Sequence, residues 1–289
     1  MNAPAIDVIV VPYDSGRRGW RMGGGPLALI ERGIMDRLRG LGLAARAVQI
    51  ELAPGASVDQ AAAYALATDI EHAVRRARAE RRFPLVLAGN CNSALGTVAG
   101  MGARSTGVVW FDAHGDFNTP ETSPSGFLDG MSLATLTGRC NVEAAARIPH
   151  FEAVSEDAVA LVGARELDDD ERTMLDGSGV RVVTVGAAMS EAVAAAVEGW
   201  PDSVLEAYVH VDLDVLDSSE ARVNEYASAG GLTLPDLLAC VDAISAHAPI
   251  GAAAITALDP DADGEGRALA AAVAVIEQIV TRAEPGGPA

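Results

Sequence analysis

The chain contains the stretch Thr106-Gly107-Val108-Val109-Trp110-Phe111-Asp112-Ala113-His114-Gly115-Asp116. Its first half is apolar and β-branched or aromatic, which is typical of a buried parallel strand. Open α/β sheets bind ligands at the C-terminal ends of their strands. Asp112, His114 and Asp116 occupy alternate positions there, and alternate side chains of an extended segment share one face. This spacing favours a metal site for Mn, Zn, Fe or Ni; a strand end with an Asp turn and a helix cap is the structural alternative.

Composition narrows the class of protein. With 289 residues, 49% of them hydrophobic, the chain can bury one large α/β core or two small ones. A formal net charge of −19 argues against binding to nucleic acid or to anionic membranes. Three widely spaced cysteines fit a reducing cytosol, and neither a signal-peptide pattern nor an apolar run approaching ~18 residues is seen. We therefore expect a cytoplasmic protein with a small-molecule partner.

Strand-like and helix-like patterns alternate along the whole chain. Apolar runs predict eight strands, at residues 6–11, 44–50, 84–88, 106–112, 158–162, 181–185, 205–211 and 251–257. Helical spacing falls between the strands, at residues 27–41, 58–82, 93–101, 131–137 and 234–244. Three further helices are expected: one that begins at about residue 168, one that ends at about residue 198 and one that ends at about residue 283. Because no linker interrupts this alternation, we expect one doubly wound α/β domain over residues 1–289 with a mainly parallel eight-stranded sheet. Residues 285–289 are expected to form a frayed tail.

Two irregular segments need interpretation. The Gly23-Gly24-Gly25-Pro26 segment precedes a helix, where it could bind phosphate, but a tight turn is favoured because the spacing of known phosphate motifs is missing. Residues 113–130 are rich in Thr, Ser, Pro and Gly, and this segment continues the chain from the Asp-His-Asp cluster. A loop this long within a compact domain favours a functional role.

A second acidic cluster repeats the logic of the first. Asp212 and Asp214 lie two residues apart at the end of another predicted strand, so both can point to one side. Together the two clusters offer four carboxylates and one imidazole. That set is sufficient to bridge two divalent ions and to activate a water held between them.

On these residues the chain resembles the ureohydrolases, a family that includes arginase and agmatinase. The matching segments are Pro12, Gly24-Gly25-Pro26, Asp112–Asp116, Asp212–Asp217 and Gly230-Gly231-Leu232-Thr233. The stretch from Asp116-Phe117-Asn118-Thr119-Pro120 to Ser125-Gly126 is most similar to the arginase branch. The resemblance implies an arginase-like parallel eight-stranded α/β fold with two divalent metal ions at the strand C-termini. The metal expected from the family is Mn²⁺.

The resemblance also implies roles for individual residues. Asp112, His114, Asp116, Asp212 and Asp214 would be metal ligands, with Asp112 and Asp212 bridging both ions and Asp116 also holding the catalytic hydroxide. Asn118, Ser123 and Ser125 fall where arginases bind the substrate α-carboxylate. Asp168 falls where they bind the α-amino group. Plain loop roles are the alternative for these four.

Three positions depart from the family pattern. Cys91 stands where a histidine normally completes the metal ligands; its thiolate is softer than imidazole, which favours Zn²⁺ or Fe²⁺ (or Ni²⁺) over Mn²⁺ or weakens one of the two sites. A buried inert cysteine is the alternative, and a cysteine here is similar to the branch that hydrolyses N-hydroxyarginine. Asp129 replaces a proton-shuttling histidine and could act as an acid or base only with a raised pKa.

The third departure concerns substrate recognition. Ala257 stands where guanidino hydrolases carry a glutamate that binds the guanidinium, and a buried cation needs a paired anion. Recognition of ordinary arginine is therefore doubtful, with Asp259 or Asp261 as possible substitutes from a shifted position. His210 lies two residues before Asp212 and on the same face of the predicted strand. This position is compatible with a role in supporting the metal ligands without binding the metal itself.

The resulting functional hypothesis is a metal-dependent amidinohydrolase. A hydroxide held between two metals would break a C–N bond in arginine, N-hydroxyarginine or a similar small substrate, releasing urea or a urea derivative. A homo-oligomer, either trimer or hexamer, is expected from the resemblance. Two alternatives remain: a non-catalytic, arginase-like regulatory or assembly protein that binds metal or ligand, and a metal-dependent hydrolase of another bond.

Overall fold

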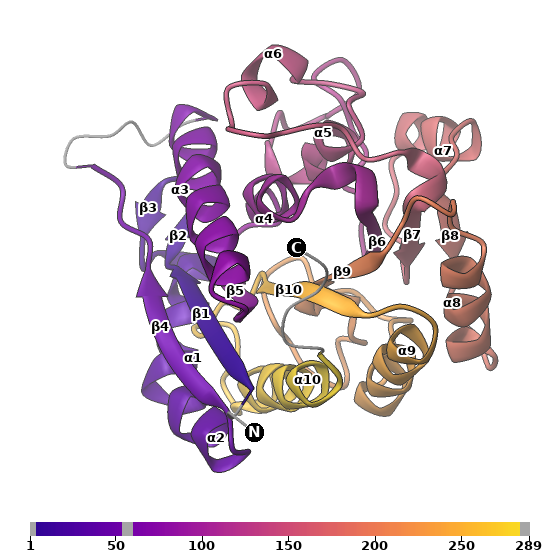
Figure 1. The fold of residues 1–289 in the computed structure, drawn as a ribbon. Coiled ribbons are helices and arrows are strands. Elements are labelled where there is room, and N and C mark those ends of the chain that lie inside the picture. Colours follow the sequence, from indigo (N-terminus) through magenta and orange to yellow (C-terminus); the bar gives the residue numbers. More distant parts are fainter. Residues whose placement is uncertain (1–3, 54–59, 284–289) are drawn as a thin grey trace.

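The computed structural model describes residues 4–53 and 60–283. Eight strands form one sheet in which every neighbouring pair is parallel, in the order β4-β1-β5-β10-β9-β6-β7-β8 (Figure 1). Their bounds are β1 (Ala5–Val11), β4 (Ala44–Gln49), β5 (Phe83–Ala88), β6 (Thr106–Phe111), β7 (Val159–Val162), β8 (Arg181–Val183), β9 (Glu206–Asp212) and β10 (Ile250–Thr256). The eight strands and the α/β class predicted from the sequence are confirmed.

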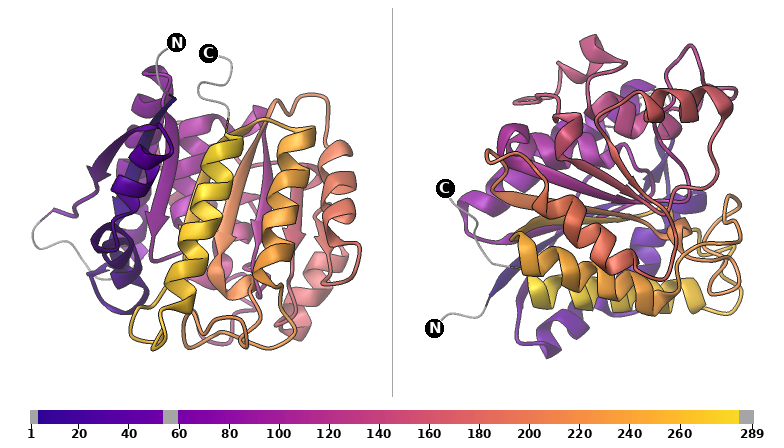
Figure 2. Two further views of the ribbon diagram at one scale, coloured as in Figure 1. Left: turned by 90° about the horizontal axis from the view of Figure 1, so that it is seen from below. Right: turned by 90° about the vertical axis from the view of Figure 1, so that its right-hand side faces the viewer.

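Helices cover both faces of the sheet (Figure 2). They are α1 (Gly25–Glu31), α2 (Ile34–Gly40), α3 (Gln60–Ala79), α4 (Ser93–Met101), α5 (Ser132–Leu136), α6 (Val142–Ala145), α7 (Asp169–Asp176), α8 (Met189–Glu198), α9 (Leu234–His247) and α10 (Arg267–Arg282). Two buried clusters result, because alternate strand residues face opposite layers. In β1, Val8 and Val10 belong to the cluster that includes residues of α1, α2, α9 and α10, whereas Ile9 and Val11 belong to the cluster that includes residues of α3 and α4.

Some local predictions were wrong. The single helix expected over residues 27–41 is two helices, because Gly33 adopts a left-handed conformation (φ +83°) between α1 and α2. A hairpin of β2 (Tyr13–Asp14) and β3 (Arg17–Arg18) was not predicted, and neither was α6. The predicted tail at 285–289 lies outside the described residues.

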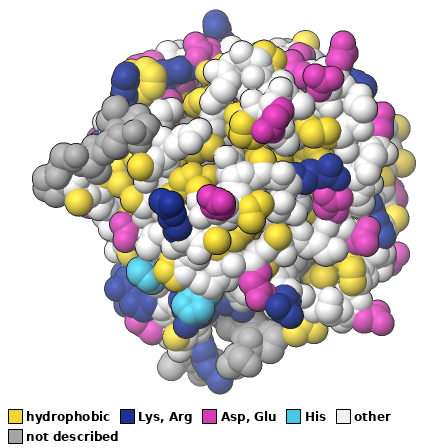
Figure 3. Space-filling view, turned by 90° about the horizontal axis from the view of Figure 1, so that it is seen from above, with side chains coloured by type: hydrophobic (Ala, Val, Ile, Leu, Met, Phe, Trp, Pro, Cys, Tyr) yellow, Lys and Arg dark blue, Asp and Glu magenta, His cyan; other side chains and the backbone are white. Residues whose placement is uncertain are grey.

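The outer surface is mixed in character. Figure 3 shows basic, acidic and apolar side chains dispersed over the face seen from above in Figure 1. Within the part of the chain that the structure describes, none of the helices has the length and apolar character needed to cross a bilayer.

Glycines let the N-terminal loop pack directly on the C-terminal edge of the sheet. A Cβ atom on Gly25 would lie 2.3 Å from the backbone oxygen of Leu258, and one on Gly89 would lie 2.3 Å from that of Tyr13. A Cβ atom on Gly23 would lie 2.7 Å from the backbone nitrogen of Asp14 and 2.8 Å from the carbonyl carbon of Tyr13. Only a residue without a side chain fits at these positions. Instead of an isolated tight turn, Gly23 and Gly24 end a short 3-10 helix (Arg21–Gly24) that leads into α1.

We expect Gly89→Ala to lower the free energy of unfolding by about 1–3 kcal/mol, because the new methyl group meets rigid backbone. Urea denaturation measures this loss. Gly40→Ala is the matched control: the site at the end of α2 has no atom within 4 Å of the new Cβ, so stability should be unchanged or higher by up to about 1 kcal/mol. Equal losses in both variants would contradict the close-approach argument.

Candidate metal centre and substrate pocket

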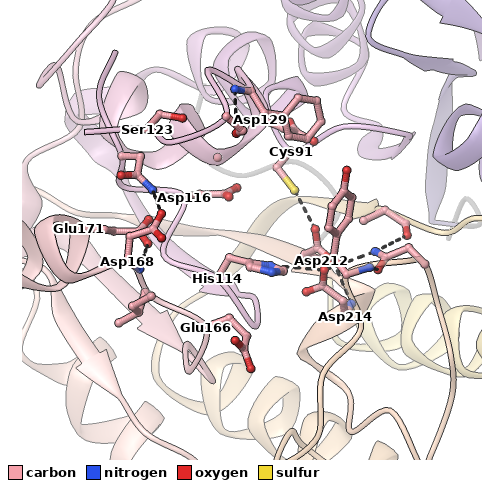
Figure 4. Close-up of a pocket in the computed structure, with 18 of the residues that line it drawn as sticks. Cys91, His114, Asp116, Ser123, Asp129, Glu166, Asp168, Glu171, Asp212 and Asp214 are labelled. Atoms are coloured by element: carbon pink, nitrogen blue, oxygen red, sulfur yellow. Dashed lines mark hydrogen bonds and ion pairs between the residues drawn. The ribbon is translucent and has the colours of Figure 1, made fainter. Parts of the chain in front are cut away.

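The two acidic clusters meet at the C-terminal edge of the sheet. Cys91 follows β5, the Asp112–Asp116 segment follows β6, and Asp212 ends β9. These strands and β10 are the four central strands of the sheet, so residues more than one hundred positions apart along the chain lie close together at this edge. Figure 4 shows Cys91, His114, Asp116, Asp212 and Asp214 around a common space.

Two overlapping groups of side chains have the geometry of metal ligands. Donor atoms of Cys91, Asp112 and Asp116 all lie within 4.8 Å of one another, and so do those of Asp112, His114 and Asp214. Asp112 belongs to both groups, which defines two adjoining positions that share one carboxylate. Asp212 adjoins the first group, where its Oδ2 accepts a hydrogen bond from Cys91 Sγ at 3.0 Å. The geometry brings together all six residues that the sequence nominated as metal ligands.

These donors fit divalent cations on their own chemistry. Asp116 Oδ2 is buried and has no hydrogen-bond partner within the described residues. A buried carboxylate oxygen without a partner is costly, and a cation is the usual compensation. Two carboxylate-rich sets that each include one nitrogen or sulfur donor match ions such as Mn²⁺, Fe²⁺ or Zn²⁺.

Burial and mutual repulsion perturb the whole cluster. Burial and then the neighbouring carboxylates raise the pKa values of Asp116 and Asp212 well above the usual range. Burial and then the Asp212 carboxylate also raise the pKa of the Cys91 thiol. Burial acts to lower the pKa of His114, but its contacts with Asp112 and Asp214 outweigh this and raise the pKa to about 12. The site thus holds negative charge that only cations or protons can balance.

A strained turn aims Asp116 at the site. Its φ is +47°, a left-handed value that is unusual for a residue other than glycine. Its backbone oxygen accepts hydrogen bonds from Leu133 N (2.9 Å) and Ala134 N (3.0 Å), at the start of α5. The helix therefore stabilises the conformation that places this side chain beside Asp112.

The donors open into a cavity of about 390 Å³. No lysine or arginine is among the described residues that line it. Its charged lining residues are acidic: Asp116, Asp129, Glu166, Asp168, Glu171, Asp212 and Asp214. Such a pocket favours a substrate with positive charge.

The predicted substrate-binding residues all line this cavity. Asn118 Nδ2 donates to Asp168 Oδ2 at 3.1 Å, so these two side chains are already held together. Ser123 Oγ and Ser125 Oγ accept hydrogen bonds from Gly126 N (3.0 Å) and Phe127 N (3.1 Å). Because a hydroxyl is both donor and acceptor, each serine can still donate to an anionic group in the cavity.

Asp129 lies deep in the same cavity. Its Oδ2 accepts a hydrogen bond from Asn90 Nδ2 at 2.8 Å, and its Oδ1 accepts one from Asn92 N at 2.9 Å. Burial raises the pKa of Asp129 to about 7 despite these two donors. A carboxyl group with this pKa can exchange protons near neutral pH.

Asn224 and Tyr226 were missed by the sequence analysis. Asn224 Nδ2 donates to Asp214 Oδ2 (3.3 Å) and to Ala257 O (3.0 Å), while its Oδ1 accepts from Tyr226 N (2.8 Å). The Tyr226 ring lies edge-on to His114, with centroids 6.3 Å apart. Both residues come from a loop without a motif, so nothing in the sequence marked them.

Glu171 was also missed, although the sequence did carry a signal for it. Asp168 begins α7 in a capping box with Glu171, the Asp-X-X-Glu pattern that marks helix starts. Glu171 Oε1 additionally accepts from Phe117 N at 2.9 Å and so ties α7 to the loop after Asp116. Capping therefore fixes one wall of the pocket.

Arg165 fixes the backbone around the candidate ligand Asp214. Its guanidinium donates to six backbone oxygens, those of Gly163, Asp214, Val215, Leu216, Ser228 and Ala229, at 2.9–3.3 Å. One side chain thereby joins the end of β7 to the turn that carries Asp214 and to a more distant loop.

Comparisons with known proteins agree with this geometry. A family model described as the arginase family matches residues 4–281. The chain is 29% identical to an arginase from Bacillus caldovelox, covering 95% of this chain and 97% of that protein. It is 31% identical to an N(omega)-hydroxy-L-arginine amidinohydrolase from Streptomyces lavendulae, covering 79% and 81%.

Solved structures are similar over almost the whole chain. The native arginase from Bacillus caldovelox superposes with a TM-score of 0.85 at 28% identity, covering 96% of this chain and 98% of that one. An arginase from Bacillus subtilis gives a TM-score of 0.84 at 28% identity with the same coverage.

Removing divalent cations should destabilise the protein, and more so at higher pH. Without cations, Asp116 and Asp212 have pKa values well above 3.8, so above that pH the folded state keeps protons that the unfolded chain has released. Stability then falls as pH rises from about 4. Above about 6.5 the raised pKa of His114 acts in the same direction.

Thermal unfolding after chelation should therefore give a lower Tm at pH 8 than at pH 5. Saturating Mn²⁺ should raise Tm at pH 8, since a ligand that binds only the folded state stabilises it. Asp36→Asn, a change at an exposed residue of α2, should respond as the unchanged protein does. A metal-stripped protein whose Tm increases over this range would contradict the charge argument.

Proposed function

The chain belongs to the arginase family, and from this premise we propose that its acidic pocket hydrolyses a guanidino C–N bond of a small amino-acid-like substrate. The observation that carries the proposal is the pair of ligand groups sharing Asp112 at the floor of a cavity without lysine or arginine among its described lining residues. Two divalent cations bound there would polarise the substrate and supply a hydroxide nucleophile near neutral pH.

We propose a division of ligands between the two positions. Cys91, Asp112 and Asp116 would hold one ion, and Asp112, His114 and Asp214 would hold the other. Asp212, whose carboxylate lies next to Cys91, would be a further ligand. Asp116 has a second task in this scheme: a carboxylate has two oxygens, so one can face a cation while the other accepts a proton from the attacking water.

The pocket walls orient the substrate. Ser123, Ser125 and Asn118 have polar groups suited to a carboxylate, and Asp168 offers an anion for an ammonium group. Asp129, whose pKa is about 7, is the candidate to give the departing amine its proton. These groups line the same cavity as the candidate metal ligands, so an α-amino acid tail and a reacting head group could be held there at once.

Ala257 directs the choice of head group. It lines the cavity beside Asn224, and its methyl group offers no charge to a guanidinium. An N-hydroxyguanidine is less basic than a guanidine and depends less on a buried anion. We therefore propose N-hydroxyarginine as the preferred substrate, which agrees with the activity that names the Streptomyces relative.

Further features of the enzyme are also proposals. Mn²⁺ is the expected metal, with Zn²⁺, Fe²⁺ and Ni²⁺ as alternatives because sulfur is a soft donor. Three free cysteines fit a reducing compartment such as the cytoplasm. A homo-oligomer is proposed on the family resemblance alone. A non-catalytic regulatory or assembly role is not favoured, because the candidate ligands, the proton donor and the substrate walls occur together.

Product analysis tests the substrate. With Mn²⁺ bound, N-hydroxyarginine should yield hydroxyurea with a kcat/KM at least tenfold above that for urea release from arginine. A tenfold ratio corresponds to a difference of only about 1.4 kcal/mol in activation free energy, and burying the guanidinium of arginine without a paired anion costs more than this. Ala257→Glu should raise the arginine value tenfold or more, while Ala257→Ser should not. Release of neither product from any guanidino compound by the metal-loaded protein would falsify the proposed function.

Asp129→Asn should lower kcat by about a hundredfold or more with little change in KM, because the proton transfer is lost while the pocket keeps its shape. The same variant should lose the pH dependence of kcat near 7. Ser132→Ala removes only a 3.4 Å hydrogen bond to Asp129 and serves as the control. A pH profile unchanged in Asp129→Asn would assign the proton transfer to another group.

A further inference from the structure

A buried polar chain lies directly behind Cys91. Tyr208 Oη is 2.8 Å from His210 Nδ1, His210 Nε2 is 3.4 Å from Thr256 Oγ1, and Thr256 Oγ1 is 3.4 Å from Cys91 Sγ. Tyr208, His210 and Thr256 are fully buried and Cys91 is 2% exposed. Thr256 is in register with Asp212 across β10 and β9, which places the chain against the ligand cluster. Hydroxyl and imidazole groups without access to solvent must satisfy one another.

The arrangement of protons in this chain depends on the tautomer of His210. The ring is fully buried and its two nitrogens contact hydroxyl groups, so a neutral imidazole with one donor and one acceptor nitrogen fits there. If the Tyr208 hydroxyl donates to Nδ1, then Nε2–H points at the Thr256 oxygen. That leaves the Thr256 hydrogen free to turn between two acceptors, Val211 O at 3.3 Å and the Cys91 sulfur.

The same imidazole also supports Asp112. Its ring stacks on Trp110, with centroids 3.7 Å apart and planes at 13°, and Trp110 Nε1 donates to Asp112 Oδ2 at 3.1 Å. His210 is thus connected to two of the three residues in the group Cys91, Asp112 and Asp116. It contacts Thr256, which contacts Cys91, and it stacks on Trp110, which donates to Asp112.

We propose that Tyr208, His210 and Thr256 are positioning residues that direct the Thr256 hydroxyl onto the Cys91 sulfur, where its hydrogen bond orients the sulfur and stabilises the negative charge that it carries as a metal ligand. The inference rests on the proposed function, since it takes Cys91 as a ligand. When the sulfur–metal bond forms, the thiol proton, which faces Asp212 Oδ2, is released to solvent, and the Thr256 O–H turns from Val211 O to the sulfur. Hydrogen bonds from such supporting residues typically change metal affinity by 10- to 100-fold.

Cobalt substitution gives a direct readout that needs no turnover. The intact protein loaded with Co²⁺ should show a thiolate-to-cobalt charge-transfer band. In Thr256→Val the band should move to lower energy, because the sulfur loses its hydrogen bond, and the Co²⁺ dissociation constant at this position should increase about 10- to 100-fold. Thr256→Ser, which keeps the hydroxyl, should restore both values.

Two controls separate this effect from general loss of packing. Thr106→Val removes a fully buried hydroxyl at the opposite end of β6 and should leave the band unchanged. Cys91→Ser should abolish it. If Thr256→Val does not fold, as judged by circular dichroism, Tyr208→Phe removes only the far end of the chain and should shift the band in the same direction by less.

The inference is overturned if the Co²⁺-loaded protein has no thiolate band, or if the band and the Co²⁺ affinity are the same in Thr256→Val, or in Tyr208→Phe where that is the variant measured. Failure of the proposed function is a separate result, since hydroxyurea and urea release are measured with Mn²⁺. A shifted band in a protein that hydrolyses no guanidino compound would support the positioning chain and refute the activity.

Discussion

Repulsion among buried carboxylates is the constraint on which this structure depends. Asp112 lies within both ligand groups, and its neighbours Asp116 and Asp212 are also buried. Such a cluster is unfavourable unless cations compensate it. The fold maintains the cluster through the parallel sheet, whose four central strands all end at this point, and through donors such as Asn224 and Arg165 that fix the surrounding backbone.

The strands and the ligand clusters were predictable from local pattern. Apolar runs that end in Asp-X-His-X-Asp and Asp-X-Asp indicate both a buried strand and candidate ligand residues at its end, so Asp112 and Asp212 could be placed together from the sequence. Asn224 and Thr256 could not be, because their roles are contacts with residues 10 and 165 positions away. The break at Gly33 was hidden for another reason: helical spacing continues across it, and only the left-handed backbone shows the interruption.

The three departures from the family pattern lie in one cavity. Cys91 and Asp129 are linked through the Asn90–Asn92 turn, whose side chain and backbone both donate to Asp129. Ala257 also lines the cavity and is tied by Asn224 to Asp214. If these residues have the proposed roles, a metal donor, a proton donor and a recognition group all differ within a single arrangement of strands, and one fold can serve related chemistries in this way.

The Arg165 guanidinium has a consequence for motion. Six carbonyl groups from three separate segments accept hydrogen bonds from this one side chain, so no segment can detach while the others keep their bonding intact. The backbone around Asp214 should therefore open as one cooperative unit rather than fray stepwise. Amide protons throughout this unit would then exchange with solvent at a common free energy, and the lifetime of a bound ion would be governed by that collective event.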